Sequence, residues 1–190
     1  MAAGIEIAKR IRVARRHYET RHLVRVLLIG LYTGTRPGAL LKLRWMASTD
    51  GGWVDLQGGV IHRRGRLAAH TKKRQPPVRI HRRLLPHLRR WHHEDAARGL
   101  THVVHYAGKS IRNIDSAWHR VRKAAGVERR DSPHVLRHSA ATLFMQAGVD
   151  VVVVAGFLGM SIEVLRNVYG HHHPMFQHAI AQVTPKKQTN

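Results

Sequence analysis

Residues 131–138 read DSPHVLRH, and this segment has the features of a helix start that carries two basic side chains. Ser132 is a favourable N-cap and Pro133 a favourable first helical residue, so His134 and Arg137, three positions apart, share one face. The free N–H groups and positive dipole end of such a helix, together with these side chains, form an anion site suited to phosphate. A solvated arginine beside a capping histidine would explain the segment equally well if it stood alone.

Three other segments carry reactive side chains in a fixed order around this helix start. Residues 32–45 read YTGTRPGALLKLRW, residues 70–74 read HTKKR ahead of a β-prone run, and residues 157–169 read FLGMSIEVLRNVY. Together with HVLRH, these segments resemble the boxes of the tyrosine recombinase, or phage integrase, family, and the resemblance runs from Leu23 to His173. One such segment alone is a weak signal, whereas four in the family's order are a strong one.

The resemblance implies a role for one residue or more in each segment. It implies a helix that ends at Thr-Gly, after which Arg36 opens the next helix as the first catalytic arginine. Tyr169, which follows Met160 at the family's spacing, is the implied nucleophile. The other implied site residues are Arg137 as the second arginine, His134, the β-hairpin lysine Lys72 with Lys73 as its substitute, and His138 in a supporting position about 100° around the helix from Arg137.

The implied chemistry needs these side chains and no metal or cofactor. Attack of a phenolate on a phosphodiester builds charge on the non-bridging oxygens, which Arg36 and Arg137 hold bidentately. A tyrosine, whose reference pKa is about 10, needs a proton acceptor or positive potential, which His134 and the arginines supply. Lys72 protonates the departing 5′-oxygen, and the 3′-phosphotyrosyl link conserves the bond energy, so rejoining needs no ATP. A two-metal nuclease would need clustered carboxylates, but the 11 acidic residues are scattered.

Two positions depart from the family pattern and predict a slower enzyme. Ala39 replaces the acidic residue that commonly stands three positions after the first arginine, and Met160 replaces the histidine or tryptophan after Leu-Gly. Methionine donates no hydrogen bond to phosphate, and loss of one such donor lowers a rate on the order of 100-fold. A tyrosine at helical spacing from Leu165 is also an ordinary core residue, so only the surrounding segments favour Tyr169 as the nucleophile.

The composition independently favours a polyanionic partner. Lys and Arg number 33 against 11 Asp and Glu, for a formal net charge of +22. This charge is spread along the chain, which indicates double-stranded DNA rather than a membrane surface. With no cysteine, no signal-peptide pattern and no membrane-length apolar run, the sequence predicts a cytoplasmic protein. The resemblance implies that it is encoded by a bacterium or phage and associates with the nucleoid. The histidines at 171–173 cannot all face one ion on a regular helix, so no metal is expected.

Periodicity predicts a mainly helical fold with one small three-stranded antiparallel sheet, which is the tyrosine recombinase catalytic fold that the resemblance implies. Apolar residues recur at helical spacing between residues 5 and 31, up to a break near Gly34. Short β-prone runs lie at 53–56, 60–62 and 78–80. Further helices are expected over 84–97, 110–125, 133–147, 149–158 and 161–169. The tryptophans are expected in the core.

The organisation expected from the sequence is a single catalytic domain. It covers residues 1–183, with a polar tail at 184–190, and lacks the N-terminal core-binding domain that clamps DNA in the family. Segment 171–183 has an apolar face, and because such a segment packs on a neighbouring protomer in the family, self-association on DNA is expected. Three functions stay open: a site-specific recombinase or integrase, a type IB topoisomerase-like enzyme, and a catalytically impaired DNA-binding prophage remnant.

Overall fold

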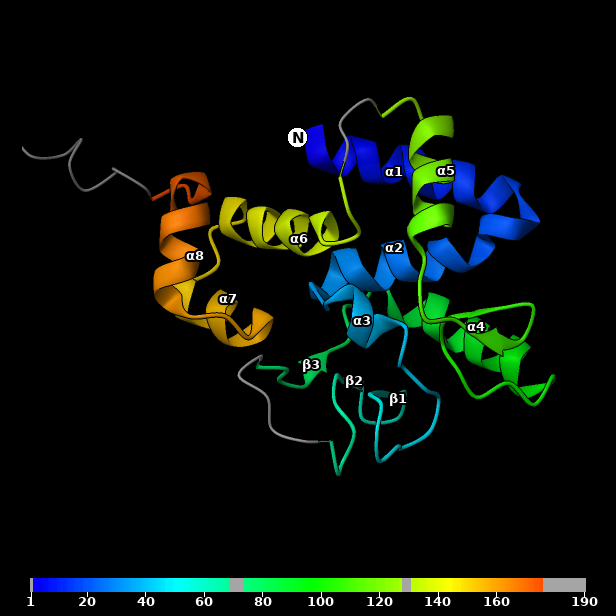
Figure 1. Ribbon diagram of the computed structural model, residues 1–190. Coiled ribbons are helices and arrows are strands. Elements are labelled where there is room, and N and C mark those ends of the chain that lie inside the picture. The colour runs from blue at the N-terminus through cyan, green and yellow to red at the C-terminus, as the bar shows by residue number, and fades with distance from the viewer. Residues whose placement is uncertain (1, 69–73, 128–130, 176–190) are drawn as a thin grey trace, which may run out of the picture.

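The computed structural model describes residues 2–68, 74–127 and 131–175 of the chain (Figure 1). The helices are α1 (Ala2–Arg16), α2 (Arg21–Thr33), α3 (Pro37–Leu40), α4 (Leu85–Ala96), α5 (Asp115–Ala124), α6 (Val135–Gln146), α7 (Val151–Leu158) and α8 (Ile162–Tyr169). Two 3-10 turns, η1 (Tyr18–Thr20) and η2 (Gly170–His172), lie between α1 and α2 and directly after α8. The fold is therefore mainly helical, which confirms the prediction from periodicity.

Helix α2 lies at the centre of the main hydrophobic core. It is buried along most of its length, and α1 and α6 pack against it. Leu23, Leu27 and Ile29 of α2 share this core with Leu136 of α6, and all four side chains are inaccessible to solvent. Burial of one such side chain contributes roughly 1.5–3 kcal/mol, so the core fixes the end of α2 relative to the start of α6. Of the four tryptophans expected in the core, Trp45, Trp91 and Trp118 are buried here, whereas Trp53 is only partly buried and stacks on His62.

A three-stranded antiparallel sheet lies below α2 and α3 in Figure 1. Its strands β1 (Trp53–Asp55), β2 (Val60–His62) and β3 (Val78–Arg79) are arranged in that order. Val54 pairs with Ile61 and Ile61 with Val78, so the buried residues of the three strands lie side by side. The sheet confirms the prediction, and its β2 strand leads into the active-site region described below.

The predicted helix start at residue 110 is wrong. β4 (His105–Tyr106) and β5 (Lys109–Ser110) form a two-stranded hairpin there, and α5 begins only at Asp115. The hairpin turns at Ala107 and Gly108, which both have positive φ. An Ala-Gly turn lacks the Asn-Gly or Asp-Gly signature of tight hairpins, so nothing in the local sequence marked this one.

Helices α7 and α8 pack on α6 and form a second, smaller apolar cluster with it. Asp150 caps α7 by accepting hydrogen bonds from two backbone N–H groups, and Ser161 caps α8 by accepting one. The buried members of the cluster are Ala141, Met145, Val154, Ala155, Leu158, Leu165 and Tyr169. Within the described ranges no single helix is long and apolar enough to cross a membrane, and α7 with the segment 162–172 would qualify only as a pair bent by 110°.

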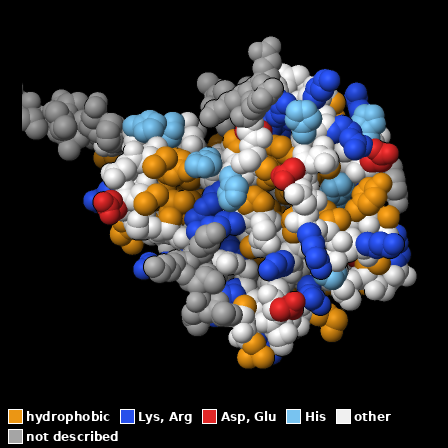
Figure 2. All heavy atoms as spheres, in the orientation of Figure 1, with side chains coloured by type: hydrophobic (Ala, Val, Ile, Leu, Met, Phe, Trp, Pro, Cys, Tyr) orange, Lys and Arg blue, Asp and Glu red, His pale blue; other side chains and the backbone are white. Residues whose placement is uncertain are grey.

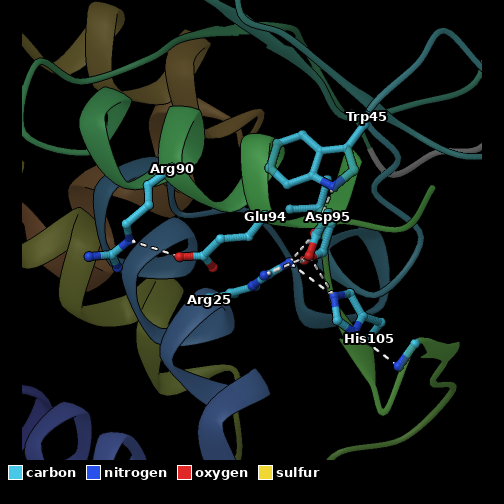
Figure 3. A network of polar contacts seen from close by, with 8 residues as sticks. Arg25, Trp45, Arg90, Glu94, Asp95 and His105 are labelled. Carbon is cyan, nitrogen blue, oxygen red and sulfur yellow. Dashed lines mark hydrogen bonds and ion pairs between the residues drawn. The ribbon is translucent and has the colours of Figure 1, made fainter. Parts of the chain in front are cut away.

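A buried carboxylate ties α2, α4 and the β4–β5 hairpin together (Figure 3). Asp95 of α4 accepts two hydrogen bonds from Arg25 of α2, one from the indole N–H of Trp45 at 2.9 Å and one from His105 at 3.0 Å. Burial opposes ionisation of this carboxyl, but the hydrogen bonds from His105, Arg25 and Trp45 outweigh it and lower the pKa of Asp95 to about 2. The charge of Arg25 is thus neutralised within the fold.

Candidate active site

The first arginine of the predicted site, Arg36, lies where α2 ends and α3 begins. Gly34 ends α2 in a left-handed conformation with φ of 61°, and Arg36 is the N-cap residue of α3. Its guanidinium donates to the carbonyl of Arg74 at 2.8 Å and to that of Gly159 at 3.4 Å. The side chain is half-buried, and burial lowers the pKa of its guanidinium. Arg36 therefore joins the chain before β3 to the end of α7.

The second arginine, Arg137, lies on the buried face of α6 and approaches the same carbonyl. Its Nη1 donates to the carbonyl of Gly34 at 3.0 Å, and its Nη2 lies 3.5 Å from the carbonyl oxygen of Gly159. Burial and the charge of Arg36 lower the pKa of Arg137 to about 10, and the charge of ionised Tyr169 opposes this change. Arg137 remains protonated at neutral pH, so two guanidinium groups converge on Gly159.

Two glycines permit this convergence because a side chain would fit at neither position. A Cβ on Gly34 would lie 2.3 Å from Cδ2 of Leu158, and a Cβ on Gly159 would lie 2.7 Å from the carbonyl oxygen of Arg74. Both glycines also have positive φ, at 61° and 67°, which disfavours other residue types. The Thr-Gly and Leu-Gly pairs of the sequence therefore mark the places where backbone segments meet at the two arginines.

The predicted nucleophile, Tyr169, is the last residue of α8 and its side chain reaches α6. The residue is only 5% exposed and belongs to the second apolar cluster. Its hydroxyl lies 2.5 Å from Nδ1 of His138. Burial raises the pKa of the phenol, and the positive charge of Arg137 partly offsets this effect. The ring of Tyr169 thus packs in the core, while its hydroxyl contacts His138 and experiences the positive charge of Arg137.

The two histidines of α6 have different surroundings. His134 is the N-cap residue of the helix and its side chain is exposed, whereas His138 contacts the phenol of Tyr169. The supporting role expected for His138 stays a prediction, and the structure adds that its ring contacts the hydroxyl of Tyr169 directly. The predicted cap by Ser132 is wrong, since α6 begins at Val135 without a side-chain cap.

A buried ion pair holds the segment that leads into α6. Arg10 of α1 donates to the carboxylate of Asp131 at 2.6 Å and lies over the ring of Trp118. The indole N–H of Trp118 also donates to this carboxylate, at 3.1 Å. Because Arg10 and Asp131 are both nearly inaccessible to solvent, their contact fixes the chain just before His134.

A third arginine at this site, the buried Arg63, directly follows β2 and was not expected from the sequence. It is 4% exposed, and its Nε donates to the hydroxyl of Thr35 at 3.0 Å. Burial, together with the charges of Arg137 and Arg36, lowers the pKa of Arg63 to about 9. Strand alternation contained the signal, because position 63 lies two residues beyond the buried Ile61 and so on the same inward face. In the described part of the chain, none of these three arginines has an ion-pair partner.

The predicted lysines, Lys72 and Lys73, lie outside the described residues. The next described residue, Arg74, contacts Arg36 through its carbonyl oxygen. On the face seen in Figure 2, basic side chains and histidines lie beside hydrophobic side chains that cover α7 and α8. Among the residues that the structure describes, no group of three or more potential metal ligands comes together.

Comparison with known proteins shows which family the chain belongs to. The sequence model of the phage integrase family matches residues 6–175, which include Arg36, Arg137, His138 and Tyr169. The chain belongs to the phage integrase family. A curated relative, tyrosine recombinase XerD of Chlorobaculum tepidum, is 41% identical over 59 residues, which are 30% of this chain and 19% of that protein. This match therefore covers only a small part of the relative.

Solved structures of phage integrase relatives show the same fold. The catalytic domain of bacteriophage HP1 integrase superposes with a TM-score of 0.62 at 19% identity, over 96% of this chain and 94% of that domain. XerH recombinase bound to its difH substrate in a pre-cleavage complex gives a TM-score of 0.63 at 21% identity, over 94% of this chain and 52% of XerH. The predicted catalytic fold is therefore confirmed.

The two departures from the phage integrase pattern lie in different parts of the site. Ala39 belongs to α3, the short helix that Arg36 opens. Met160 follows Gly159, and its partly buried side chain packs against the second apolar cluster. Neither side chain can donate a hydrogen bond to a phosphate oxygen.

Proposed function

We propose that this chain is the catalytic domain of a site-specific recombinase or integrase, which cleaves and rejoins double-stranded DNA through a 3′-phosphotyrosyl intermediate. One observation carries the proposal: Arg36 and Arg137 converge on the carbonyl of Gly159, and the charge of Arg137 partly offsets the rise that burial causes in the pKa of the Tyr169 phenol. The net charge of +22 and the DNA-bound state of XerH support DNA as the substrate. We expect such an enzyme, encoded by a bacterium or a phage, to act in the cytoplasm.

The cleavage step is a transfer of phosphorus from one oxygen to another. The hydroxyl of Tyr169 loses its proton to Nδ1 of His138, which lies 2.5 Å away. Its oxygen then bonds to phosphorus as the bond to the 5′-oxygen breaks. Arg36 and Arg137 each donate to two carbonyls, and because an arginine has five N–H groups, both retain donors for the non-bridging oxygens. Rejoining is the reverse attack by a 5′-hydroxyl and needs neither ATP nor a cofactor.

Lys72 supplies the proton that the departing 5′-oxygen takes up, and Lys73 is its substitute. The carbonyl of Arg74 lies at Arg36, and the two residues from Arg74 back to position 72 span at most about 7 Å. Separate Lys72→Ala and Lys73→Ala variants identify the donor. The variant that lacks it cleaves ordinary DNA slowly but cleaves DNA with a 5′-bridging sulfur at the native rate, because a thiolate leaves without protonation.

Self-association on DNA accompanies this function. Five apolar side chains on and just after α7 and α8 are 47–60% exposed: Val152, Val153, Val164, Val168 and Met175. Exposed apolar side chains gathered in this way favour contact with a partner surface, and a recombinase that pairs two sites needs a second copy. The C-terminal segment 171–183, of which residues up to 175 are described, contributes to this contact. Cross-linking with and without DNA tests it, with Val153→Asp as the disrupting variant.

A catalytically impaired DNA-binding remnant is the second candidate, because Ala39 and Met160 stand where the family has polar groups. The deciding experiment traps a covalent complex on nicked suicide DNA that carries the genuine recombination site. The native chain and Tyr106→Phe, which alters an exposed tyrosine of β4, are expected to give an adduct on a denaturing gel, and Tyr169→Phe none. Binding without any adduct would favour the remnant. Relaxation of supercoiled DNA without paired sites would instead indicate a type IB topoisomerase-like enzyme.

A further inference from the structure

Arg63 contacts both of the backbone segments on which the catalytic arginines depend. Its Nε donates to the hydroxyl of Thr35 at 3.0 Å, and its Nη2 donates to the carbonyl of Thr33. Its Nη1 donates to the carbonyl of Phe157 at 2.8 Å, and the guanidinium lies over the ring of the same residue. One side chain from the sheet thus joins the α2–α3 turn to the last turn of α7.

These acceptors lie next to the groups that hold the phosphate-binding arginines. Thr33 and Thr35 flank Gly34, whose carbonyl accepts a hydrogen bond from Arg137. Phe157 stands two residues before Gly159, the carbonyl that both arginines approach. A shift of either segment would therefore move a guanidinium away from its position, and the planar fork of an arginine limits such shifts better than a flexible ammonium would.

Arg63 is a costly choice if its only task is stability. Its side chain is 4% exposed and has no carboxylate partner among the described residues, although it lies in the field of two other cations. Apolar residues of similar size commonly replace buried charges without loss of stability. An excess of positive charge at this point is useful only when an anion arrives, and the nearest anion that the proposed reaction brings is the scissile phosphate.

We propose that Arg63 is a positioning residue for phosphate activation, which sets the geometry of Arg36 and Arg137 from behind and adds positive potential to the phosphate site. The inference rests on the proposed DNA cleavage function and deepens it. Arg63 touches no reacting atom, since its donors point to protein carbonyls and a hydroxyl. It acts on the transition state through the two arginines, where negative charge develops on the non-bridging oxygens.

The test compares a normal scissile phosphodiester with a methylphosphonate, in which a methyl group replaces one non-bridging oxygen and removes the negative charge. The chains are the native protein, Arg63→Met, Arg63→Lys and the control Arg79→Met, which alters an exposed arginine on β3. The rate of Tyr169 adduct formation is measured at saturating DNA. Thermal unfolding shows which variants fold. If Arg63→Met does not fold, Arg63→Lys, which keeps the positive charge but not the planar fork, takes its place in the test.

We expect Arg63→Met to lower the rate of adduct formation on the phosphodiester on the order of 100-fold. On the methylphosphonate, the fold-loss caused by the same substitution should be several times smaller. Arg63→Lys should recover part of the loss, and Arg79→Met should leave both rates near native. Equal losses on the two substrates in a folded variant, or no loss, would overturn the role of Arg63 while the proposed cleavage function stands. If the native chain formed no adduct on the phosphodiester or on the methylphosphonate, both the role of Arg63 and the proposed cleavage function would be overturned.

Discussion

Two side-chain clusters in this protein show opposite uses of buried positive charge. The Asp95 cluster consists of Arg25, Trp45, Asp95 and His105, and the arginine cluster consists of Arg36, Arg63 and Arg137. In the first, Asp95 accepts hydrogen bonds from all three partners (Figure 3). In the second, the guanidinium groups donate only to backbone carbonyls and one hydroxyl, and no carboxylate neutralises them within the described residues.

The difference separates a structural use of charge from a functional one. A cation that folding neutralises holds helices together, because removal of either partner leaves a buried charge uncompensated. A cation that folding leaves without a counter-charge keeps its attraction for an external anion. The pKa of Asp95 falls to about 2 because its partners outweigh burial, whereas those of Arg137 and Arg63 fall to about 10 and about 9 because burial and mutual repulsion disfavour their charge.

The largest expected effect is the loss of cleavage in Arg137→Ala. We expect the rate of adduct formation to fall about 1,000-fold, or about 4 kcal/mol, because a donor pair for the transition-state oxygens is removed. The free energy of unfolding should change by less than about 1 kcal/mol, because relief of repulsion among the cations offsets the lost hydrogen bonds. Arg98→Ala removes the same charge from an exposed position after α4 and serves as the control. If the free energy of unfolding fell by as much as the activation free energy rose, the arginine cluster would be structural rather than functional.

Asp95→Asn should show the opposite pattern. The variant leaves Arg25 without a counter-charge, so we expect the free energy of unfolding to fall by about 3 kcal/mol in urea titrations. The adduct rate of the folded fraction should stay near native. Glu94→Gln is the matched control, because it removes the neighbouring exposed pair with Arg90 at 3.6 Å and should cost less than about 1 kcal/mol (Figure 3). An unchanged stability in Asp95→Asn would contradict the structural role.

Acidification should abolish part of the contribution of Asp95. The pKa of this carboxyl is lower in the fold than its ordinary value of 3.8, so its stabilising contribution is complete above about pH 4 and is lost as pH falls towards 2. The difference in unfolding free energy between native protein and Asp95→Asn should shrink by about 2 kcal/mol across that interval. Urea titrations at pH 5, 4, 3 and 2 measure it. A constant difference would show that the carboxylate is not stabilised in the fold.

The smallest expected effect is that of Met160→His, which adds a hydrogen-bond donor beside the arginine cluster. The new side chain would stand next to Gly159 and supply a donor that methionine lacks, so we expect cleavage to become faster on the order of tenfold. Single-turnover rates on the suicide substrate measure the gain, and Met46→His, at an exposed position, is the control. A slower Met160→His variant would indicate that packing of the methionine against the second apolar cluster matters more than hydrogen bonding.

Local spacing predicted much of the fold and named most of the candidate site. The helix periods, the Gly34 break and the β-prone runs all belong to contiguous segments, and the structure confirms them. The β4–β5 hairpin was not predicted because its Ala-Gly turn lacks the residue types that mark tight hairpin turns. The catalytic roles of Arg36, Arg137, His134, Lys72 and Tyr169 stay predictions, and the variants above address those of Arg137, Lys72 and Tyr169.

The sequence by itself determined the candidate side chains of the four boxes, because each box is a short segment whose residue types and spacing are recognisable without the fold. Only the tertiary structure decided that the phenol of Tyr169 meets His138, which is 31 residues away, and that Arg63 joins Thr35 to Phe157 across 28 and 94 residues. Such contacts depend on how α6, α7, α8 and the sheet pack. Packing is set by the combined burial of many side chains, which no local spacing encodes.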